Sequence, residues 1–381
     1  VLDFIKIKRD GTSVTGANIS IKINNDFMKA VEADEDYILR FPCDMNCSIK
    51  TEFSSALPYN ELVENKPDNT TSYFKKIRAK EYWDEIIKSA HGYAEPGIIF
   101  VDNHHNYSPD GVYPQFKGVT TNPCGEIFMQ PYDACRLIAV NLFSFVKNPF
   151  TKDAEFDIKK FYEVNYEAMR LSDDLIDLEI EHINRIREKI ENDPESDEVK
   201  KRESKLWQKV LATAMYSRRT GLGFTALGDC LAALGLKYDS EEALLFIEQM
   251  MHVKMESELD CTIDLAILRG TFAGWNIKQE FITQPDIVGT NDFYDFILEK
   301  FPKQSKRMMK YGRRNVSFST IAPTGTVSLL TQTTSGLEPL FMPFYMRRKK
   351  VNGDERVDFI DEIGDKWQEF PVLHQKFKDW I

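Results

Sequence analysis

Three stretches of the chain have the hydrophobic patterns of strands. Residues 18–24 alternate apolar and polar side chains with a period of two, which is typical of a strand with one buried face. Residues 97–101 are apolar after the initial glycine, as expected of a strand that is covered on both faces in a parallel sheet. Residues 137–146 have a similar pattern with two polar interruptions, so we predict a strand there as well.

Long amphipathic helices are predicted in the middle of the chain. Over residues 158–190 apolar side chains recur every three or four positions with charges between them, which predicts one long helix. Asp193-Pro194 should end it. Helical patterns resume over residues 206–218 and 240–269. Strands that alternate with helices predict an α/β fold rather than a bundle or a sandwich.

Length, charge and cysteine content narrow the class of protein. A chain of 381 residues has room for one large domain or two smaller ones. Its six cysteines are irregularly spaced, which argues against a disulfide scaffold and predicts a reducing, cytoplasmic setting. The net charge of -11 argues against a nucleic-acid polymer as partner. No apolar run approaches the roughly 20 residues of a membrane helix, so we expect a soluble, enzyme-sized protein without a membrane partner.

Candidate chemistry is concentrated in residues 122–126, Asn-Pro-Cys-Gly-Glu. A thiol, an amide and a carboxylate around Pro and Gly are typical of a tight turn that presents reactive side chains. Cys135 follows Cys124 by eleven positions. Taken alone, either cysteine is most simply a buried structural thiol. The spaced pair, together with Asn122 and Glu126, favours a functional site.

A second candidate site follows residues 315–322, which are predicted to form a strand. The next residues turn into a predicted helix, and such a turn can bind phosphate through free backbone N–H groups and the helix dipole. No lysine follows the turn, so it is not a Walker-type loop. An ordinary N-cap, by the first or second threonine, explains the segment equally well. The residues of the turn are Pro323, Thr324, Gly325, Thr326, Val327 and Ser328.

Three other polar or small-residue motifs are given structural interpretations. His104-His105 has no accompanying ligand cluster, so we predict no metal site and expect surface histidines. Arg313-Arg314 is interpreted as a solvated charge run, although it lies close to the possible phosphate turn. The Gly-Leu-Gly segment at 221–223 is weak evidence for a nucleotide loop and more simply indicates a close helix contact.

Together these motifs resemble the large catalytic subunit of ribonucleotide reductase, most closely its adenosylcobalamin-dependent class II. The resemblance runs from about Gly16 to Pro339 and is carried by three motifs. Class I enzymes usually have Leu in the second position of the cysteine turn and a wider cysteine spacing, which favours class II. The motifs are NPCGE at 122–126 with Cys135 at its spacing, SRRTGLGFTALGD at 217–229 and APTGTVSLLTQTTSGLEP at 322–339.

The resemblance implies an α/β fold of a particular kind, a ten-stranded α/β barrel with the cysteine turn as a central finger loop. It implies that Cys124 becomes a thiyl radical and takes the 3′ hydrogen of the substrate ribose. Glu126 would act as base on the 3′-hydroxyl and Asn122 would hold the hydroxyls. Cys135 would be one of two thiols that end as a disulfide. The radical itself would come from the cofactor, adenosylcobalamin.

The resemblance also implies partners and an incomplete domain. The expected partners are a ribonucleotide substrate, dNTP or ATP effectors, a thioredoxin-like or other dithiol reductant, and a second copy of the chain in a homodimer. Residues 1–381 would be a single catalytic barrel domain that lacks the effector region and the C-terminal tail. A polar loop near the N-terminal end resembles the segment that relays effector information, which would be allosteric coupling. Its candidate residues are Lys8, Arg9, Asp10, Gly11 and Gly16.

Three alternatives remain open. The chain could belong to a class I large subunit, which uses a radical from a partner subunit. A glycyl-radical enzyme would share the barrel and a finger-loop cysteine, but it needs a C-terminal glycyl motif that is not found in this sequence. The third alternative is a non-enzymatic module built from a reductase fragment. A cobalamin-binding assay on the purified protein would distinguish such a module from the enzyme.

Overall fold

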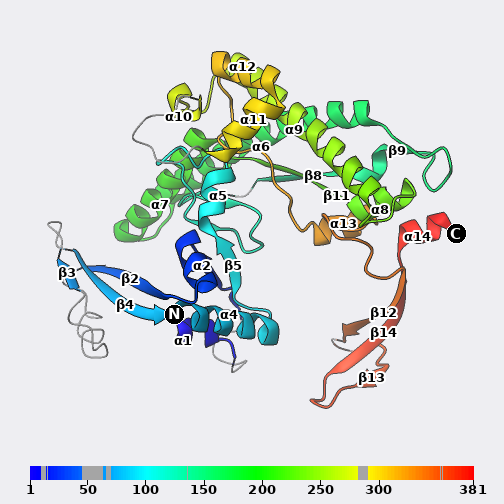
Figure 1. Ribbon diagram of the computed structural model, residues 1–381, viewed down its shortest axis with the longest axis horizontal. Helices are drawn as coiled ribbons and strands as arrows, with labels where there is room; N and C mark the ends of the chain where they lie inside the picture. Colours follow the sequence, from blue (N-terminus) through cyan, green and yellow to red (C-terminus); the bar gives the residue numbers. More distant parts are fainter. Residues whose placement is uncertain are drawn as a thin grey trace. The chain divides into compact units, whose positions relative to one another are not determined.

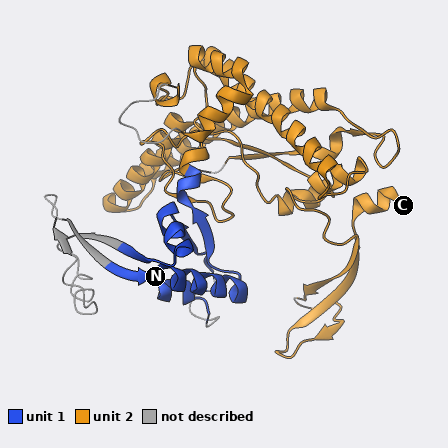
Figure 2. Ribbon diagram, viewed as in Figure 1, with its two compact units in different colours: residues 1–104 blue, residues 105–381 orange. Residues whose placement is uncertain are grey.

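The computed structural model describes residues 1–9, 14, 16–44, 63–65, 70–134, 136–281, 291–351, 353 and 355–381. They form two compact units, residues 1–104 and residues 105–381 (Figure 2). Each unit is described by itself, and the single domain expected over residues 1–381 stays a prediction. Among the described residues, no helix combines the length and the apolar character needed to cross a membrane.

The first unit contains two strands that the sequence predicts, and they pair in parallel. β1 (Ser20–Ile23) pairs with β5 (Gly97–Phe100), with Ile21 opposite Ile98. The parallel pairing is confirmed, but the expectation that this strand is covered on both faces is wrong, since Phe100 is exposed. The other elements of the unit are α1 (Leu2–Lys6), α2 (Asn25–Glu32), α4 (Ala79–Tyr93), and the antiparallel strands β2 (Asp36–Asp44), β4 (Thr70–Arg78) and β3 (Val63–Asn65), in the order β2-β4-β3. α5 (Val101–Tyr107) follows β5.

The second unit is built around a parallel pair, β8 (Leu137–Asn141) and β11 (Gly221–Thr225). All five residues of β11 are buried. Residues 317–320 run along β11, where Leu222 N–H donates to Phe318 O (2.8 Å) and Thr320 N–H donates to Leu222 O (3.1 Å). The strand predicted over residues 315–322 is thus reduced to one bridge, between Leu222 and Ser319.

The strand predicted over residues 137–146 is interrupted after Asn141. The Asn141 side chain accepts a hydrogen bond from Phe143 N–H (3.1 Å), and a 3-10 turn, η2 (Leu142–Phe145), begins there. β9 (Val146–Lys147) then pairs with β10 (Glu155–Phe156). The polar interruption in the hydrophobic pattern therefore marks the end of the strand.

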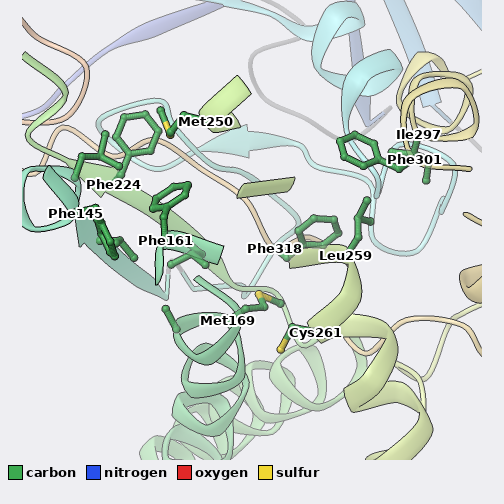
Figure 3. Close-up of a cluster of buried hydrophobic side chains, with 14 of the residues drawn as sticks. Phe145, Phe161, Met169, Phe224, Met250, Leu259, Cys261, Ile297, Phe301 and Phe318 are labelled. Atoms are coloured by element: carbon green, nitrogen blue, oxygen red, sulfur yellow. The ribbon is translucent and has the colours of Figure 1, made fainter. Parts of the chain in front are cut away.

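Three long helices cover the second unit. α6 (Ile158–Asn192) and α9 (Glu241–Arg269) match their predictions, and the predicted stop at Asp193 is the C-cap of α6. α7 (Asp197–Ser217) begins earlier than expected. The buried faces of α6 and α9 meet in one core, where the Phe145 and Phe161 rings lie 5.3 Å apart and Met169, Cys261 and Phe318 also lie (Figure 3).

The remaining elements of the second unit are short (Figure 1). None of the sheets in the described part of the chain closes on itself. The mixture of helix and strand is therefore confirmed, whereas the ten-stranded barrel stays a prediction. These elements are β6 (Thr120–Thr121), β7 (Phe128–Met129), α8 (Leu227–Ala233), α10 (Ile277–Phe281), α11 (Asp292–Lys300), α12 (Pro302–Tyr311), α13 (Gly325–Thr331), β12 (Phe344–Lys350), β13 (Phe359–Ile360), β14 (Lys366–Leu373) and α14 (Gln375–Trp380).

Candidate active site at the thiol turn

Residues 122–126, called the thiol turn below, connect the antiparallel strands β6 and β7. Asn122 closes the turn with three hydrogen bonds. Its N–H donates to Ile127 O (3.1 Å), its carbonyl accepts from Gly125 N–H (3.0 Å), and its side-chain oxygen accepts from Ile127 N–H (3.2 Å). Gly125 has a φ of 84°, in the left-handed region that glycine adopts without strain. The sequence therefore folds locally into the tight turn that its composition predicts.

The thiol and the carboxylate of the turn differ in exposure. Cys124 is exposed at the tip. Glu126 is half-buried, and its Oε2 is buried without a hydrogen bond to any described residue. An unsatisfied buried carboxylate oxygen is costly. It can accept a hydrogen bond from a hydroxyl that is brought to the turn.

Thr320 links the thiol turn to the segment beside β11. Its hydroxyl donates to Glu126 O (2.9 Å), while its N–H is bonded to β11. Gly221 makes room for this contact, because a Cβ there would lie 2.8 Å from Thr320 Cγ2 and 3.1 Å from Ile127 Cδ1. Thr320 was not predicted as a site residue. Ser317 and Ser319 lie in the same segment, so no local signal distinguishes the hydroxyl of Thr320.

The possible phosphate turn begins two residues after the segment that carries Thr320. Thr324 has a φ of 53° and is the N-cap of α13, but its side chain does not cap the helix. Its hydroxyl donates to Thr225 Oγ1 (3.0 Å) and accepts from Gly336 N–H (2.7 Å). Thr326 lies inside the helix, so the ordinary side-chain N-cap is wrong for both threonines.

The N-terminal end of α13 is open to solvent. Pro323, Gly325, Thr326 and Val327 are exposed, whereas Ser328 is buried. The Ser328 N–H donates to Thr324 O (2.8 Å) and its hydroxyl donates to Gly325 O (2.8 Å). Thr320 therefore connects the thiol turn to a segment that leads into the exposed first turn of α13.

Two adjacent arginines after α7 are buried and point to different partners. Arg218 donates to Asp173 (2.7 Å) and Asp177 (2.9 Å), both on α6. Arg219 donates to Asp110 (2.9 Å) and Asp133 (2.7 Å). Since Asp133 lies shortly after β7, the second arginine ties the start of β11 to the hairpin that carries the thiol turn.

Arg313 is buried and Arg314 is half-buried, so their interpretation as a solvated charge run is wrong. Arg313 is 0% exposed and donates to Glu280 (3.0 Å) and to Tyr294 Oη (2.9 Å). Arg314 donates to Asp173 (3.3 Å). The partners come from distant parts of the sequence, which is why the local pattern did not reveal them.

Two smaller interpretations also need correction. His105 is half-buried, with a ring nitrogen 3.1 Å from Gly118 O, so the surface location expected for this pair is wrong. A Cβ at Gly223 would lie 2.6 Å from Thr320 O. The Gly-Leu-Gly segment thus permits close approach of a neighbouring extended segment rather than of a helix.

Lys8 and Arg9, which were predicted to belong to the effector loop, make the ion pairs described for them inside their own unit. Lys8 binds Glu95 (2.7 Å) and Arg9 binds Glu85 (2.5 Å), within the first unit, and Gly16 is exposed. Asp10, Gly11 and Cys135 lie outside the described residues. In the described part of the chain, no group of three His, Cys, Asp or Glu side chains could hold a metal ion.

Comparison with known proteins gives the family. The model of the ribonucleotide reductase barrel domain matches residues 1–367. This chain belongs to that family. It is 26% identical over 373 residues to a vitamin B12-dependent ribonucleoside-diphosphate reductase of Thermoplasma acidophilum. The aligned residues cover 97% of this chain and 41% of that relative.

Two further relatives are also named as vitamin B12-dependent reductases. A vitamin B12-dependent ribonucleoside-diphosphate reductase of Mycobacterium tuberculosis is 27% identical over 340 residues, 89% of the chain and 40% of the relative. A vitamin B12-dependent ribonucleotide reductase of Streptomyces clavuligerus is 24% identical over 349 residues, 87% of the chain and 31% of the relative. The reductase barrel chain thus spans less than half the length of these relatives. The family expected from the three motifs is confirmed, while the roles of individual residues stay predictions.

Proposed function

We propose that this chain carries the radical thiol of a cobalamin-dependent ribonucleotide reductase, which converts ribonucleotides to 2′-deoxyribonucleotides. The observation that carries the proposal is the thiol turn itself. It combines exposed Cys124 with a Glu126 carboxylate oxygen that is buried and unbonded among the described residues. The names of the relatives support the cofactor class and the reaction.

The chemistry assigns a distinct task to each residue of the turn. A Cys124 thiyl takes the hydrogen atom from C3′ of the ribose and returns one at the end. Glu126 accepts the proton of the 3′-hydroxyl, and the 2′-hydroxyl leaves as water after protonation. The two electrons come from a cysteine pair that includes Cys135 and becomes a disulfide. Asn122 holds the turn closed, and it would also hold the substrate hydroxyls.

The thiol at the tip of the turn fits a cofactor of the cobalamin class, which would act on its S–H bond. Cys124 is exposed, so its S–H bond is accessible to a large cofactor. Adenosylcobalamin would supply the radical that removes this hydrogen atom. Cys124 is therefore the residue of this chain that would face the cofactor, and Glu126 would act on the substrate.

The turn at the start of α13 is proposed to hold the substrate phosphates. The exposed N–H groups of Gly325, Thr326 and Val327 and the positive end of the helix favour an anion. Gly325→Val should weaken nucleotide binding more than Thr326→Ala, because a lost neutral hydrogen bond is worth only about 0.5–1.5 kcal/mol. A Cβ at Gly325 meets nothing within 4 Å, so the valine variant should fold. Equal dissociation constants for the two variants would contradict the site.

The wider assembly is proposed from the family alone. The chain would contribute strands to the ten-stranded barrel, with the thiol turn as its finger loop. dNTP or ATP effectors would act through the loop that includes Lys8, Arg9 and Gly16, and a thioredoxin-like or other dithiol would regenerate the cysteine pair. Two copies of the complete subunit would form a homodimer.

The test uses a complete reductase that contains this chain. Cys124→Ser should abolish formation of deoxynucleotides while leaving nucleotide binding nearly unchanged. Cys230→Ala, which changes a buried thiol of α8, is the control and should remain active. A Cys124→Ser variant with a tenth or more of the activity would contradict the proposal. Turnover that depends on a partner subunit rather than on adenosylcobalamin would favour the class I alternative.

A further inference from the structure

Lys254 and Glu258 form an almost fully buried ion pair on α9. Lys254 is 1% exposed and Glu258 is 0% exposed, and the Nζ–Oε1 distance is 2.6 Å. Two charges removed from water are costly unless each is well bonded. The other contacts of the ammonium group therefore show what the pair is connected to.

The Lys254 ammonium group joins three elements. Besides Glu258, it donates to Leu222 O of β11 (2.9 Å) and to Ser319 Oγ of the neighbouring segment (2.7 Å). An ammonium group has three donors, and each of them has an acceptor here. α9, β11 and residues 317–320 are thus fixed to one another at a single nitrogen.

This attachment fixes the register of the segment that holds the thiol turn. Leu222 O accepts both from Lys254 Nζ and from Thr320 N–H. Ser319 is bonded to Lys254, and the next residue, Thr320, donates instead to Glu126 O. Successive side chains of an extended segment face opposite sides, so a slip by one residue would exchange them. The Ser319 bond therefore decides that Thr320 faces the thiol turn.

We propose that Lys254 and Glu258 are positioning residues that hold the thiol turn through Ser319 and Thr320. The catalytic meaning of this role rests on the function proposed above, whereas the mechanical link does not. If the pair only stabilised the core, its loss would affect the second unit generally. If it positions the turn, its loss should loosen residues 122–127 selectively.

The main test measures hydrogen exchange by mass spectrometry on the 381-residue chain. Lys254→Met combined with Glu258→Leu removes both charges, so neither is left buried alone, and such replacements are often tolerated. The N–H groups of Gly125 and Ile127, which are bonded inside the turn, should exchange about tenfold faster, as expected for the loss of a hydrogen bond. Amides in the middle of α6 should keep their rates.

Single substitutions along the link provide independent tests and a rescue. Thr320→Val removes the donor to Glu126 at nearly constant shape and should also speed exchange in the turn, whereas Thr320→Ser keeps the hydroxyl and should restore slow exchange. Ser319→Ala removes one bond but leaves Lys254 and Glu258 paired, so it should fold and give a smaller change in the same direction. Glu198→Gln breaks an exposed pair on α7 and is the control without effect.

The outcomes separate the two proposals. Unchanged exchange of the turn in the folded double variant and in Ser319→Ala would overturn the positioning role. Uniformly faster exchange across the second unit would also overturn it, because that is the signature of a purely structural pair. A turn that loosens as expected, in a protein whose complete form does not need Cys124, would instead uphold the positioning link and reject the proposed function.

Discussion

The cysteines described in the second unit occupy contrasting environments. Cys124 is exposed on the thiol turn, whereas Cys230 and Cys261 are buried in helices. Burial raises the pKa of Cys230 to about 12, with the nearby Asp229 acting in the same direction. Burial likewise raises the pKa of Cys261 above its usual range. Only the thiolate is a strong nucleophile, so reactivity should differ sharply among them.

Alkylation at pH 8 should therefore select Cys124. With a pKa near 12, only about one Cys230 in ten thousand is a thiolate at that pH. Brief treatment with iodoacetamide, followed by peptide mass spectrometry, should find label on Cys124 and almost none on Cys230 or Cys261. The same treatment in urea is the control and should label all three. Equal labelling of Cys124 and Cys230 in the folded chain would contradict the burial of Cys230.

Gly223 is the glycine whose replacement should most directly disturb the site. Its added Cβ would lie 2.6 Å from a backbone oxygen, Thr320 O, which cannot move without separating β11 from residues 317–320. Gly223→Ala should lower the free energy of unfolding by about 1–3 kcal/mol. Gly92→Ala is the matched control, because its Cβ meets nothing within 4 Å in α4. Urea denaturation should show a loss for Gly223→Ala alone, and equal stability of the two variants would contradict the close approach.

At the scale of elements, one carboxylate on α6 organises three helix ends. Asp173 accepts hydrogen bonds from Arg218 after α7 (2.7 Å), Arg314 after α12 (3.3 Å) and Arg269 at the end of α9 (3.2 Å). Burial alone would raise the pKa of Asp173. The hydrogen bond and charge of Arg218, together with Arg314, outweigh burial and hold this pKa below its usual value of 3.8.

Asp173→Asn should strongly destabilise the second unit, because it removes the anion that the buried Arg218 shares with the half-buried Arg314 and the more exposed Arg269. The expected loss is about 3–5 kcal/mol in the free energy of unfolding at pH 7. Since the pKa is lowered on folding, the stabilisation is complete above the usual pKa of 3.8 and is lost as the pH falls through the lower folded value. The difference between wild type and variant should therefore shrink below pH 3.8.

Asp174 offers a matched control for this prediction. It is the next residue, and its side chain is 34% exposed and paired with Arg170 and Arg269. Exposed ion pairs contribute only about 0–1 kcal/mol, so Asp174→Asn should have a small effect. Urea denaturation at pH 7 and pH 3 distinguishes the two. Similar losses for both variants would mean that Asp173 does not hold the helix ends together.

Helices were the elements best predicted from the sequence, for a physical reason. α6 is long and buries residues that recur every three or four positions, so its pattern suffices. α9 is also long, but its residues 257–263 are all buried, so its length rather than a single buried face indicates a helix. Residues 315–322 were harder to predict, because the composition of a segment is the same whether it forms a full ladder or a single bridge. The hydrogen bonds of that segment depend on β11, which lies far away in sequence.

The part of the candidate site made of neighbouring residues could be predicted from the sequence. The part that depends on contacts between distant residues could not. Asn122, Cys124 and Glu126 are contiguous, so the sequence alone indicated the turn. The turn is held by the hydroxyl of Thr320, and the segment of Thr320 is in turn bonded to Lys254. Neither residue was predicted from the sequence. Lys254 and Glu258 are one helical turn apart, a spacing typical of exposed ion pairs. Only the packing of α9 shows that this pair is buried.

At the scale of the whole molecule, the family could be identified from motifs, but the closed barrel could not be derived from the described strands. The parallel pairs β1–β5 and β8–β11 lie in separate compact units. Within the second unit, β8, β11 and residues 317–320 run side by side in parallel. Closure needs strand neighbours that the sequence pattern does not specify.

The position of β11 between β8 and residues 317–320 affects how the chain folds during its synthesis on the ribosome. Thr220 and Ser317, which are hydrogen-bonded across this boundary, are 97 residues apart. While the intervening chain is being translated, one edge of β11 stays open, and Lys254 lacks its Ser319 acceptor. Unpaired edges in nascent chains attract chaperones or other chains. Ribosome-stalled chains that expose residues 1–300 should therefore be cut by protease within β11, and those that expose residues 1–340 should resist it.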